Sequence, residues 1–183
     1  MRVLGIVGSP RHNGNTQILV EQILKGAEEE GAEVVTLELS HARIRECDGC
    51  NQCWKGDACV KNDDMNQYYL EIAHSDVIVF GTPVYWYGPS ALMKGFLDRF
   101  VYFNCPENRP MVKGKRAILA VPFEENDLET ADPLIRMFRK SLAYLEMELQ
   151  EIILAPGVLN KGEVTKKRDI MEAAKAAGKR SVR

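Results

Sequence analysis

Several features that would assign the chain to a specialised class of protein are missing from it. No uninterrupted apolar run approaches the roughly 18 residues that a membrane-spanning helix needs, and there is no internal repeat, low-complexity segment or Pro/Ser-rich linker. Charge of one sign is also scarce, because the formal net charge is only −2 over 183 residues. A balance this close to neutral favours neither nucleic acid nor a membrane surface as a partner. We therefore expect a single domain over residues 1–183, with 45% hydrophobic residues to build its core.

The start of the chain predicts a cytoplasmic protein. The apolar run Val3–Val7 is too short for the core of a signal peptide, and a glycine turn follows it at once. In a reducing compartment the five cysteines are not expected to form a disulfide framework. Four of them lie between Cys47 and Cys59, which indicates metal or redox chemistry instead.

Short apolar runs alternate with helical periodicity along the chain. Strands are expected at Met1–Val7, Val34–Leu39, Val77–Phe80, Ala117–Val121 and Ile152–Ala155. Helices are expected over Asn15–Glu30, from about Asp63, around Leu92–Phe100, from Asp132 to about Met147, and up to about Gly178. This alternation predicts an α/β fold, in which right-handed crossovers place helices on both faces of a five-stranded parallel sheet.

The loop after the first predicted strand has the composition of an anion site. It reads Gly8-Ser9-Pro10-Arg11-His12-Asn13-Gly14-Asn15-Thr16 and leads directly into a helix, whose first N–H groups lack partners within the helix. Hydroxyl, amide and guanidinium donors gather there, namely Ser9, Thr16, Asn13, Asn15 and Arg11. Neither a G-x-x-x-x-G-K-[ST] nor a G-x-G-x-x-G pattern occurs, so the terminal phosphate of a mononucleotide fits best. In the alternative interpretation Ser9 and Asn13 are turn residues and Thr16 is a helix cap.

A second loop follows the third predicted strand and is rich in aromatic residues. It reads Gly81-Thr82-Pro83-Val84-Tyr85-Trp86-Tyr87-Gly88-Pro89-Ser90. In open α/β sheets, ligands bind beyond the carboxyl ends of the strands where the strand order reverses. Three successive aromatic side chains at such a place offer a face on which a planar ring can stack.

Together the two loops resemble the NADPH-dependent FMN reductase family. The resemblance rests on Gly8-Ser9-Pro10-Arg11, Gly14-Asn15-Thr16, Thr82–Pro89 and Lys94…Phe96-Leu97-Asp98-Arg99, and covers about the first hundred residues. It implies a flavodoxin-like three-layer sandwich with strand order 2-1-3-4-5. It also implies that the FMN phosphate is held by Ser9, Arg11, Asn15 and Thr16, and that the isoalloxazine is bordered by Pro83, Val84, Tyr85, Trp86 and Tyr87, with Pro122 and Phe123 as a further wall. Lys94, Asp98 and Arg99 are expected to be structural or interfacial.

The irregular stretch over about residues 41–62 contains Cys47-x2-Cys50-x2-Cys53-x5-Cys59. Three thiolates at this spacing can surround one corner of a cubane, and Cys59 can complete the ligand set. Within the family the pattern resembles the compact motif of iron–sulfur flavoproteins, which implies a [4Fe–4S] cluster. Zinc and metal-free thiols stay open as alternatives, although zinc sites usually use two separated cysteine pairs. Cys105 lies outside the pattern and is expected to be an ordinary buried thiol.

The expected function is that of a redox flavoprotein, in which FMN is reduced by NAD(P)H or a redox protein and passes electrons to the cluster or another acceptor. One alternative is a cluster-free NAD(P)H-dependent reductase of flavin, quinone or another small acceptor, and another is a non-enzymatic binding module with a zinc-stapled loop. Because the flavin accepts hydride itself, no catalytic side chain is expected. His12, His41 and His74 are expected to be separate surface or turn residues. The resemblance implies a homodimer or homotetramer.

Overall fold

A parallel sheet of five strands forms the middle layer of the protein. In the computed structural model, which describes residues 1–183, its strands are β1 (Arg2–Val7), β2 (Glu33–Glu38), β3 (Val77–Gly81), β6 (Arg116–Pro122) and β7 (Glu148–Ala155). They pair in the order β2-β1-β3-β6-β7, and every neighbouring pair is parallel. When only these five strands are counted, this is the order 2-1-3-4-5, so the predicted fold class is confirmed.

The burial of each strand follows from its place in the sheet. β1, β3 and β6 lie at the centre, and nearly all of their residues are buried. A strand covered by helices on both faces needs apolar side chains on both, which explains its continuous apolar sequence. β2 and β7 lie at the edges and keep half-exposed and exposed residues.

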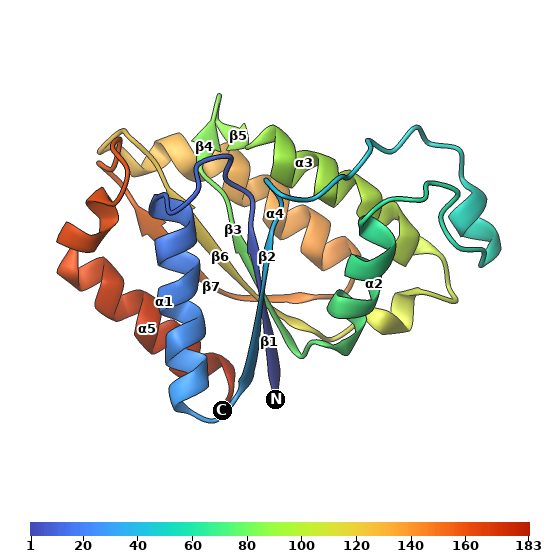
Figure 1. Cartoon of the computed structure of the whole chain (residues 1–183), viewed down its shortest axis with the longest axis horizontal. Helices are drawn as coiled ribbons and strands as arrows, with labels where there is room; N and C mark the ends of the chain where they lie inside the picture. The colour runs from blue at the N-terminus through green and yellow to red at the C-terminus, as the bar shows by residue number, and fades with distance from the viewer.

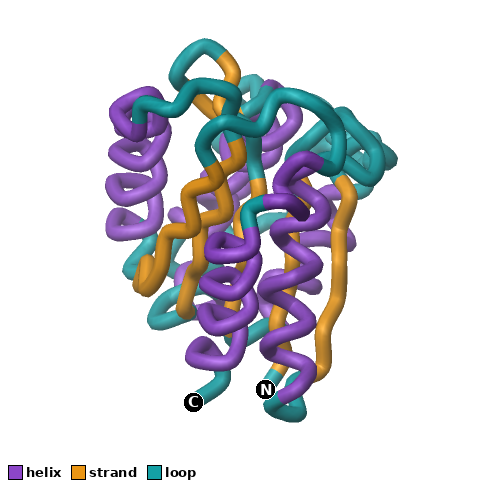
Figure 2. The backbone as a smooth tube through the Cα atoms, turned by 90° about the vertical axis from the view of Figure 1, so that its left-hand side faces the viewer, coloured by secondary structure: helices purple, strands orange, loops and turns teal.

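Helices cover both faces of the sheet (Figure 1). One layer contains α1 (Asn15–Glu29) and α5 (Arg168–Ser181), and the other contains α2 (Met65–His74), α3 (Ala91–Asp98) and α4 (Asp132–Tyr144). Each layer encloses its own apolar core against the sheet, built around side chains such as Leu19 and Ile23 on one face and Phe80 and Phe96 on the other. Figure 2 shows α1 and α5 side by side in front of the strands, with both chain termini at the same end. None of the helices is long and apolar enough to cross a membrane.

Two glycines allow α1 and α5 to pack backbone to backbone. A Cβ atom at Gly26 would lie 2.0 Å from the carbonyl oxygen of Lys175, and one at Gly178 would lie 1.9 Å from that of Ile23. Both distances are far below contact, so no other residue fits at either position without moving a helix. Gly178 is therefore a packing residue inside α5 rather than its end, and the helix continues to Ser181.

The predicted boundaries differ from the structure where the sequence carries no stop signal or no apolar pattern. α4 ends at Tyr144 rather than near Met147, because Glu146 adopts a left-handed backbone with φ of 59°. β7 begins at Glu148 rather than at Ile152, because its first half, on the edge of the sheet, is polar. The predicted helix around Leu92–Phe100 becomes a 3-10 helix over Arg99–Asn104 after α3.

Two connections leave the sandwich at the upper edge of the sheet in Figure 1. The first, between β2 and α2, contains residues 41–62 and has only one short 3-10 helix, Gln52–Lys55; we call residues 41–62 the cysteine segment. The second follows β3 and folds into a miniature antiparallel hairpin of β4 (Val84–Tyr85) and β5 (Gly88–Pro89); we call it the aromatic hairpin.

Candidate functional site

A cavity of about 510 Å³ opens at the carboxyl ends of the central strands. Four connections contribute to it: the loop after β1, the aromatic hairpin after β3, the loop after β6 and the loop after β7. The residues that line it are Ser9, Arg11, Asn15, Thr16, Pro83, Val84, Tyr85, Trp86, Tyr87, Pro122, Phe123, Glu124, Glu125, Thr130, Val158, Leu159 and Lys161. Every residue predicted for the FMN site lies among them except Asn13. Two loops that are about 70 residues apart in sequence therefore meet around one space, as the reversal of strand order between β1 and β3 requires.

The N-terminus of α1 faces this cavity without a cap. Gly14 occupies the N-cap position and has no side chain to accept a hydrogen bond, and the first turn contains no acidic residue. The first backbone N–H with a partner in the helix is that of Ile18, which donates to the carbonyl of Gly14. The N–H groups of residues 15–17 are thus free, and the positive end of the helix dipole is uncompensated. The interpretation of Thr16 as a cap is wrong, because Thr16 is the second residue of the helix.

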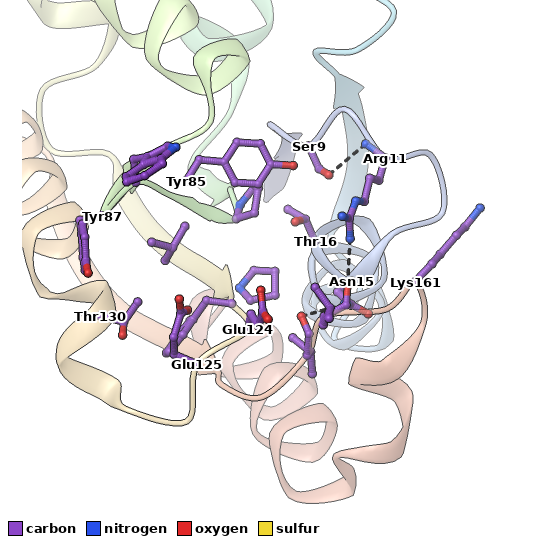
Figure 3. Close-up of a pocket in the computed structure, with 17 residues that line it drawn as sticks. Ser9, Arg11, Asn15, Thr16, Tyr85, Tyr87, Glu124, Glu125, Thr130 and Lys161 are labelled. Carbon is purple, nitrogen blue, oxygen red and sulfur yellow. Dashed lines mark hydrogen bonds between the residues drawn. The ribbon is translucent and has the colours of Figure 1, made fainter.

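Polar side chains surround that helix end (Figure 3). Thr16 is only 2% exposed. Its side-chain hydroxyl makes no hydrogen bond within the chain, so the hydroxyl can donate to a ligand in the cavity. The Ser9 hydroxyl accepts the backbone N–H of Arg11 at 3.2 Å. The Arg11 guanidinium donates to the carbonyl of Leu159 at 2.8 Å, which ties it to the loop after β7. Lys161 of the same loop also lines the cavity, with its side chain directed outward in Figure 3. Arg11 therefore places positive charge at the end of the cavity where the helix begins.

Asn15 lines the cavity, but its side-chain amide is already hydrogen-bonded within the chain, whereas Asn13 does not line the cavity. Asn15 is buried, and its amide donates to the carbonyl of Asn160 at 2.9 Å while its oxygen accepts the N–H of Val164 at 3.2 Å. It therefore joins α1 to the loop after β7. Asn13 has a left-handed backbone with φ of 50°, and its N–H donates to Oε1 of Gln17 at 2.7 Å. It lies outside the cavity lining.

The aromatic hairpin turns at Trp86 and Tyr87, which both have a left-handed backbone, with φ of 50° and 63°. Positive φ at both central residues defines the type I′ turn that suits a two-residue hairpin, although bulky side chains are uncommon there. Trp86 is 96% exposed. The hairpin thus keeps three aromatic side chains at the mouth of the cavity rather than in the core.

Hydrogen bonds tie the aromatic hairpin to the loop after β1. The Ser90 N–H donates to Oγ1 of Thr82 at 3.1 Å, and the Ser90 hydroxyl donates to the carbonyl of Gly8. Gly8 in turn donates its N–H to the carbonyl of Gly81 at 2.7 Å. The two walls that face the ligand space are therefore held in a common frame by buried contacts.

A third wall comes from residues that the sequence analysis did not name. Glu124, Glu125 and Thr130 follow β6, whereas Leu159 and Lys161 follow β7. In Figure 3, Ser9, Arg11 and Thr16 gather beside α1, Tyr87 lies on the far side of the cavity with Tyr85 between them, and the two glutamates lie along the lower side. The cavity is therefore cationic at the helix end and acidic on the wall after β6. The rule that loops at the carboxyl ends of neighbouring strands form one site points to these segments, but it does not select residues within them.

The four cysteines of the cysteine segment surround a second, much smaller cavity of about 20 Å³. Cys47, Cys50, Cys53 and Cys59 all line it, and all are free thiols. Burial raises the pKa of the Cys53 thiol, and the nearby Cys59 and Cys47 raise it further. No three of the sulfur atoms lie within 4.8 Å of one another. Cys105 is buried and does not line this cavity.

Arg99 lies beneath the cysteine segment and holds it in place. It is 1% exposed, and its guanidinium donates to Oδ2 of Asp63 at 2.7 Å, to the carbonyl of Arg45 at 2.9 Å and to Sγ of Cys59 at 3.2 Å. Burial opposes ionisation of the Asp63 carboxyl, but the hydrogen bonds from Arg99 and from the backbone of Arg45 outweigh it and hold its pKa below the usual value. One buried side chain thus fastens both ends of the segment.

Lys94 and Asp98, which the sequence analysis grouped with Arg99, do not contact the cysteine segment. Lys94 and Asp98 form an exposed ion pair one turn apart on α3, at 2.5 Å. The histidines differ from expectation in one respect: His12 and His41 are not separate, because both lie beside Glu38 at the end of β2. Only His74, the last residue of α2, lies away from the other two.

A comparison with known protein families shows which family the chain belongs to. Residues 1–149 match the family described as NADPH-dependent FMN reductase. The chain belongs to this family. Both loops of the cavity that the sequence analysis named lie within the matched residues, and the protein is an oxidoreductase of the NADPH-dependent FMN reductase family.

Relatives with assigned names fall into two groups. The chain is 36% identical to an iron–sulfur flavoprotein of Archaeoglobus fulgidus over 115 residues. This stretch covers 63% of this chain and 51% of the relative. The chain is 39% identical over 99 residues to an iron–sulfur flavoprotein of Methanocaldococcus jannaschii, 54% of this chain and 51% of the relative. The chain thus matches about half the length of both. A putative NAD(P)H-dependent FMN-containing oxidoreductase of Bacillus subtilis, YwqN, is 25% identical over 99% of this chain and 98% of its own length.

Solved structures of similar fold also occur. An NAD(P)H:quinone oxidoreductase from Methanothermobacter marburgensis superposes with a TM-score of 0.74 at 18% identity, over 97% of this chain and 93% of that one. An FMN-dependent NADH-azoreductase from Bacillus anthracis, in complex with FMN, has a TM-score of 0.70 at 15% identity, over 100% of both chains. At such identities these structures support the fold of this member of the NADPH-dependent FMN reductase family and nothing finer.

Proposed function

We propose that the protein is an FMN-dependent oxidoreductase of the cytoplasm that also carries a [4Fe–4S] cluster in its cysteine segment. The observation that carries the FMN assignment is that one cavity joins the uncapped start of α1 to the aromatic hairpin. These are the two features that a flavin phosphate and a flavin ring need, and they lie at the reversal of strand order.

In this proposal the phosphate of FMN occupies the end of the cavity beside α1. The free backbone N–H groups of residues 15–17, the Thr16 hydroxyl and the Ser9 hydroxyl hydrogen-bond to it, and Arg11 and Lys161 neutralise its charge. Asn15 supports the site indirectly, because its amide groups are already committed to the loop after β7. Asn13 contributes backbone geometry through Gln17.

The residues 83–87 border the isoalloxazine, with Pro122 and Phe123 on the opposite side. When bound, FMN supplies a ring that accepts hydride from a nicotinamide without a protein acid or base. The chain's contribution is to orient this ring and to limit its contact with water. Glu124 and Glu125 place negative charge along the cavity and disfavour further negative charge on a ligand there.

The donor set of the cysteine segment suits an iron–sulfur cluster better than zinc. Four sulfurs bound to one zinc ion at about 2.3 Å lie only about 3.8 Å apart, whereas no three of these sulfurs lie within 4.8 Å of one another. In a cubane each cysteine binds a different iron, which suits a wider arrangement of Cys47, Cys50, Cys53 and Cys59. When bound, such a cluster supplies one-electron transfer. Arg99 adds a charged N–H donor to the sulfur of Cys59.

We propose NAD(P)H or a redox protein as the electron donor and a homodimer or homotetramer as the assembly. Anaerobic addition of NADPH to the FMN-loaded protein tests the first point. Loss of the flavin absorbance is expected within one turnover, and unchanged absorbance with both NADPH and NADH would exclude the nicotinamide donor.

Iron, sulfide and zinc analysis of anaerobically purified protein tests the cluster; zinc at one per chain without iron would favour a zinc-stapled binding module.

A cluster-free NAD(P)H-dependent reductase of flavin, quinone or another small acceptor is the second candidate. The match to YwqN favours it, because that relative spans nearly the whole of this chain and its name includes no iron–sulfur group. NADPH-dependent reduction of a quinone by protein that lacks iron would support this candidate. Activity that depends on iron content would support the first.

A further inference from the structure

We infer that His12, Glu38 and His41 form a binding site for a divalent transition-metal ion of the zinc class. Nδ1 of His12 lies 3.3 Å from Oε2 of Glu38, and Nδ1 of His41 lies 4.0 Å from the same oxygen. One ligand atom from each of the three residues lies within 4.8 Å of the other two. This inference does not depend on the proposed function, because none of the three residues lines the FMN cavity or the cysteine cavity.

The sheet register brings these residues together. Glu38 is the last residue of β2 and pairs with Val7, the last residue of β1. His12 lies in the loop that leaves β1, and His41 lies three residues after Glu38. Two loops that start at neighbouring strand ends therefore place an imidazole on either side of the Glu38 carboxylate.

The donor set determines which ions fit. Two imidazole nitrogens and one carboxylate oxygen suit zinc and its first-row neighbours, whereas magnesium and calcium prefer oxygen ligands alone. Three protein ligands leave at least one coordination position for water or an anion, as in catalytic rather than structural zinc sites. The side chains of His12 and His41 are 58% and 66% exposed, so an ion from solution can reach them.

A buried side chain orients the carboxylate. Nε2 of Gln17 donates to Oε1 of Glu21 at 2.9 Å and to Oε1 of Glu38 at 3.4 Å, and Oε2 of Glu38 lies toward both histidines. Gln17 is 6% exposed, and its own oxygen accepts the N–H of Asn13. Outer contacts of this kind are typical of metal-ligating carboxylates. An ion bound here would connect the loop of His12, which also carries Arg11, to the end of β2.

Titration with Co²⁺, a spectroscopic substitute for Zn²⁺, tests the inference. The wild-type protein is expected to bind one Co²⁺ whose visible d–d absorption lacks the near-ultraviolet thiolate-to-cobalt band that cysteine ligands produce. The variants His12→Ala, His41→Ala and Glu38→Gln should each lose this ion or bind it at least about 10-fold more weakly. Zn²⁺ should displace it from the wild type.

Matched variants separate this site from other histidines and from the cysteines. His74→Ala should bind Co²⁺ as the wild type does, and replacing Cys47, Cys50, Cys53 and Cys59 by Ser should leave the band-free signal intact. If His12→Ala fails to fold, His41→Ala provides the same test outside the loop after β1. Equal binding by the wild type and all three ligand variants, or a Co²⁺ signal that always includes the thiolate band, would overturn the inference.

Discussion

The cavity at the carboxyl ends of the strands, which we propose binds FMN, and the cysteine segment are built in opposite ways. The cavity lies where regular elements end: the start of α1, the ends of three strands and a hairpin tied to Gly8 through Ser90. The cysteine segment has almost no regular structure and is fastened to the sandwich by a few polar contacts with Arg99, Asp63 and Asp64. The first region is therefore placed by the fold as a whole, whereas the second depends on a few polar contacts. The two should respond differently to substitution.

The largest expected effect is a complete loss of iron binding with no change in FMN affinity. Replacing Cys50 and Cys53 together by Ser should abolish iron binding, because two of the four thiolates that we propose as cluster ligands are lost. FMN affinity should stay unchanged, since neither residue lines the larger cavity. Iron and sulfide analysis and a fluorescence titration with FMN measure the two quantities. Cys105→Ala is the control and should retain iron; equal loss of iron in this control would show that the cluster is held elsewhere.

The next effect tests whether Arg99 is the main support of the cysteine segment. Arg99→Ala removes the close charged partner of the Asp63 carboxylate, whose side chain is 4% exposed, and leaves only the Arg45 guanidinium at 4.0 Å. Removal of one partner of a buried ion pair costs about 3–5 kcal/mol, so the free energy of unfolding should fall by that amount. Urea denaturation measures it, and Lys94→Ala, which breaks only an exposed pair, should lower stability by less than about 1 kcal/mol.

The same pair has a pH signature that distinguishes an electrostatic role from simple packing. The pKa of Asp63 is lowered in the folded protein, so its stabilising contribution is present above the unfolded value near 4 and is lost as the pH falls through the folded value. The wild type should therefore lose stability on acidification below about pH 4. The Arg99→Ala variant should show a smaller loss over that range. Parallel curves for the two proteins would contradict the assignment.

A smaller effect concerns the phosphate end of the cavity. Arg11→Ala should weaken FMN binding by about 1.5–3 kcal/mol, because a charge-assisted contact is removed, and should leave iron content unchanged. A fluorescence titration with FMN measures the affinity. Arg136→Ala, an exposed arginine on α4, is the matched control and should bind FMN as the wild type does. Undiminished affinity of the Arg11 variant would place the phosphate away from this end.

The smallest effect concerns the turn of the aromatic hairpin. Trp86→Gly should relieve about 1–2 kcal/mol of left-handed strain and cost about 0.5–1 kcal/mol of chain entropy. The free energy of unfolding should therefore rise by about 0.5–1 kcal/mol. Urea denaturation of Trp86→Gly beside Trp86→Val checks it, since a β-branched residue tolerates this backbone poorly and should lower stability. A loss of stability in both variants would mean that the exposed indole makes stabilising contacts.

The fold could be predicted largely from local pattern. Buried parallel strands are continuous apolar runs, and β1, β3 and β6 show this clearly. Two of the four loops that line the cavity could also be found, because their chemistry is local: Gly14 leaves a helix start open, and Tyr85 follows a strand end. The edge strand β7 and the end of α4 were less predictable, since polar edge residues and a left-handed Glu146 carry no distinct signal.

By itself the sequence determined the order of the elements, the family, and the residue types available at each strand end. Only the tertiary structure decided which of them work together. In the folded chain the amide of Asn15 hydrogen-bonds to the loop after β7, Glu124 and Lys161 line the cavity, and Arg99 donates a hydrogen bond to Cys59. The tertiary structure also joined His12 and His41 across Glu38. The physical reason is that these contacts connect residues tens of positions apart, and their partners are selected by strand register and helix packing, which no local pattern encodes.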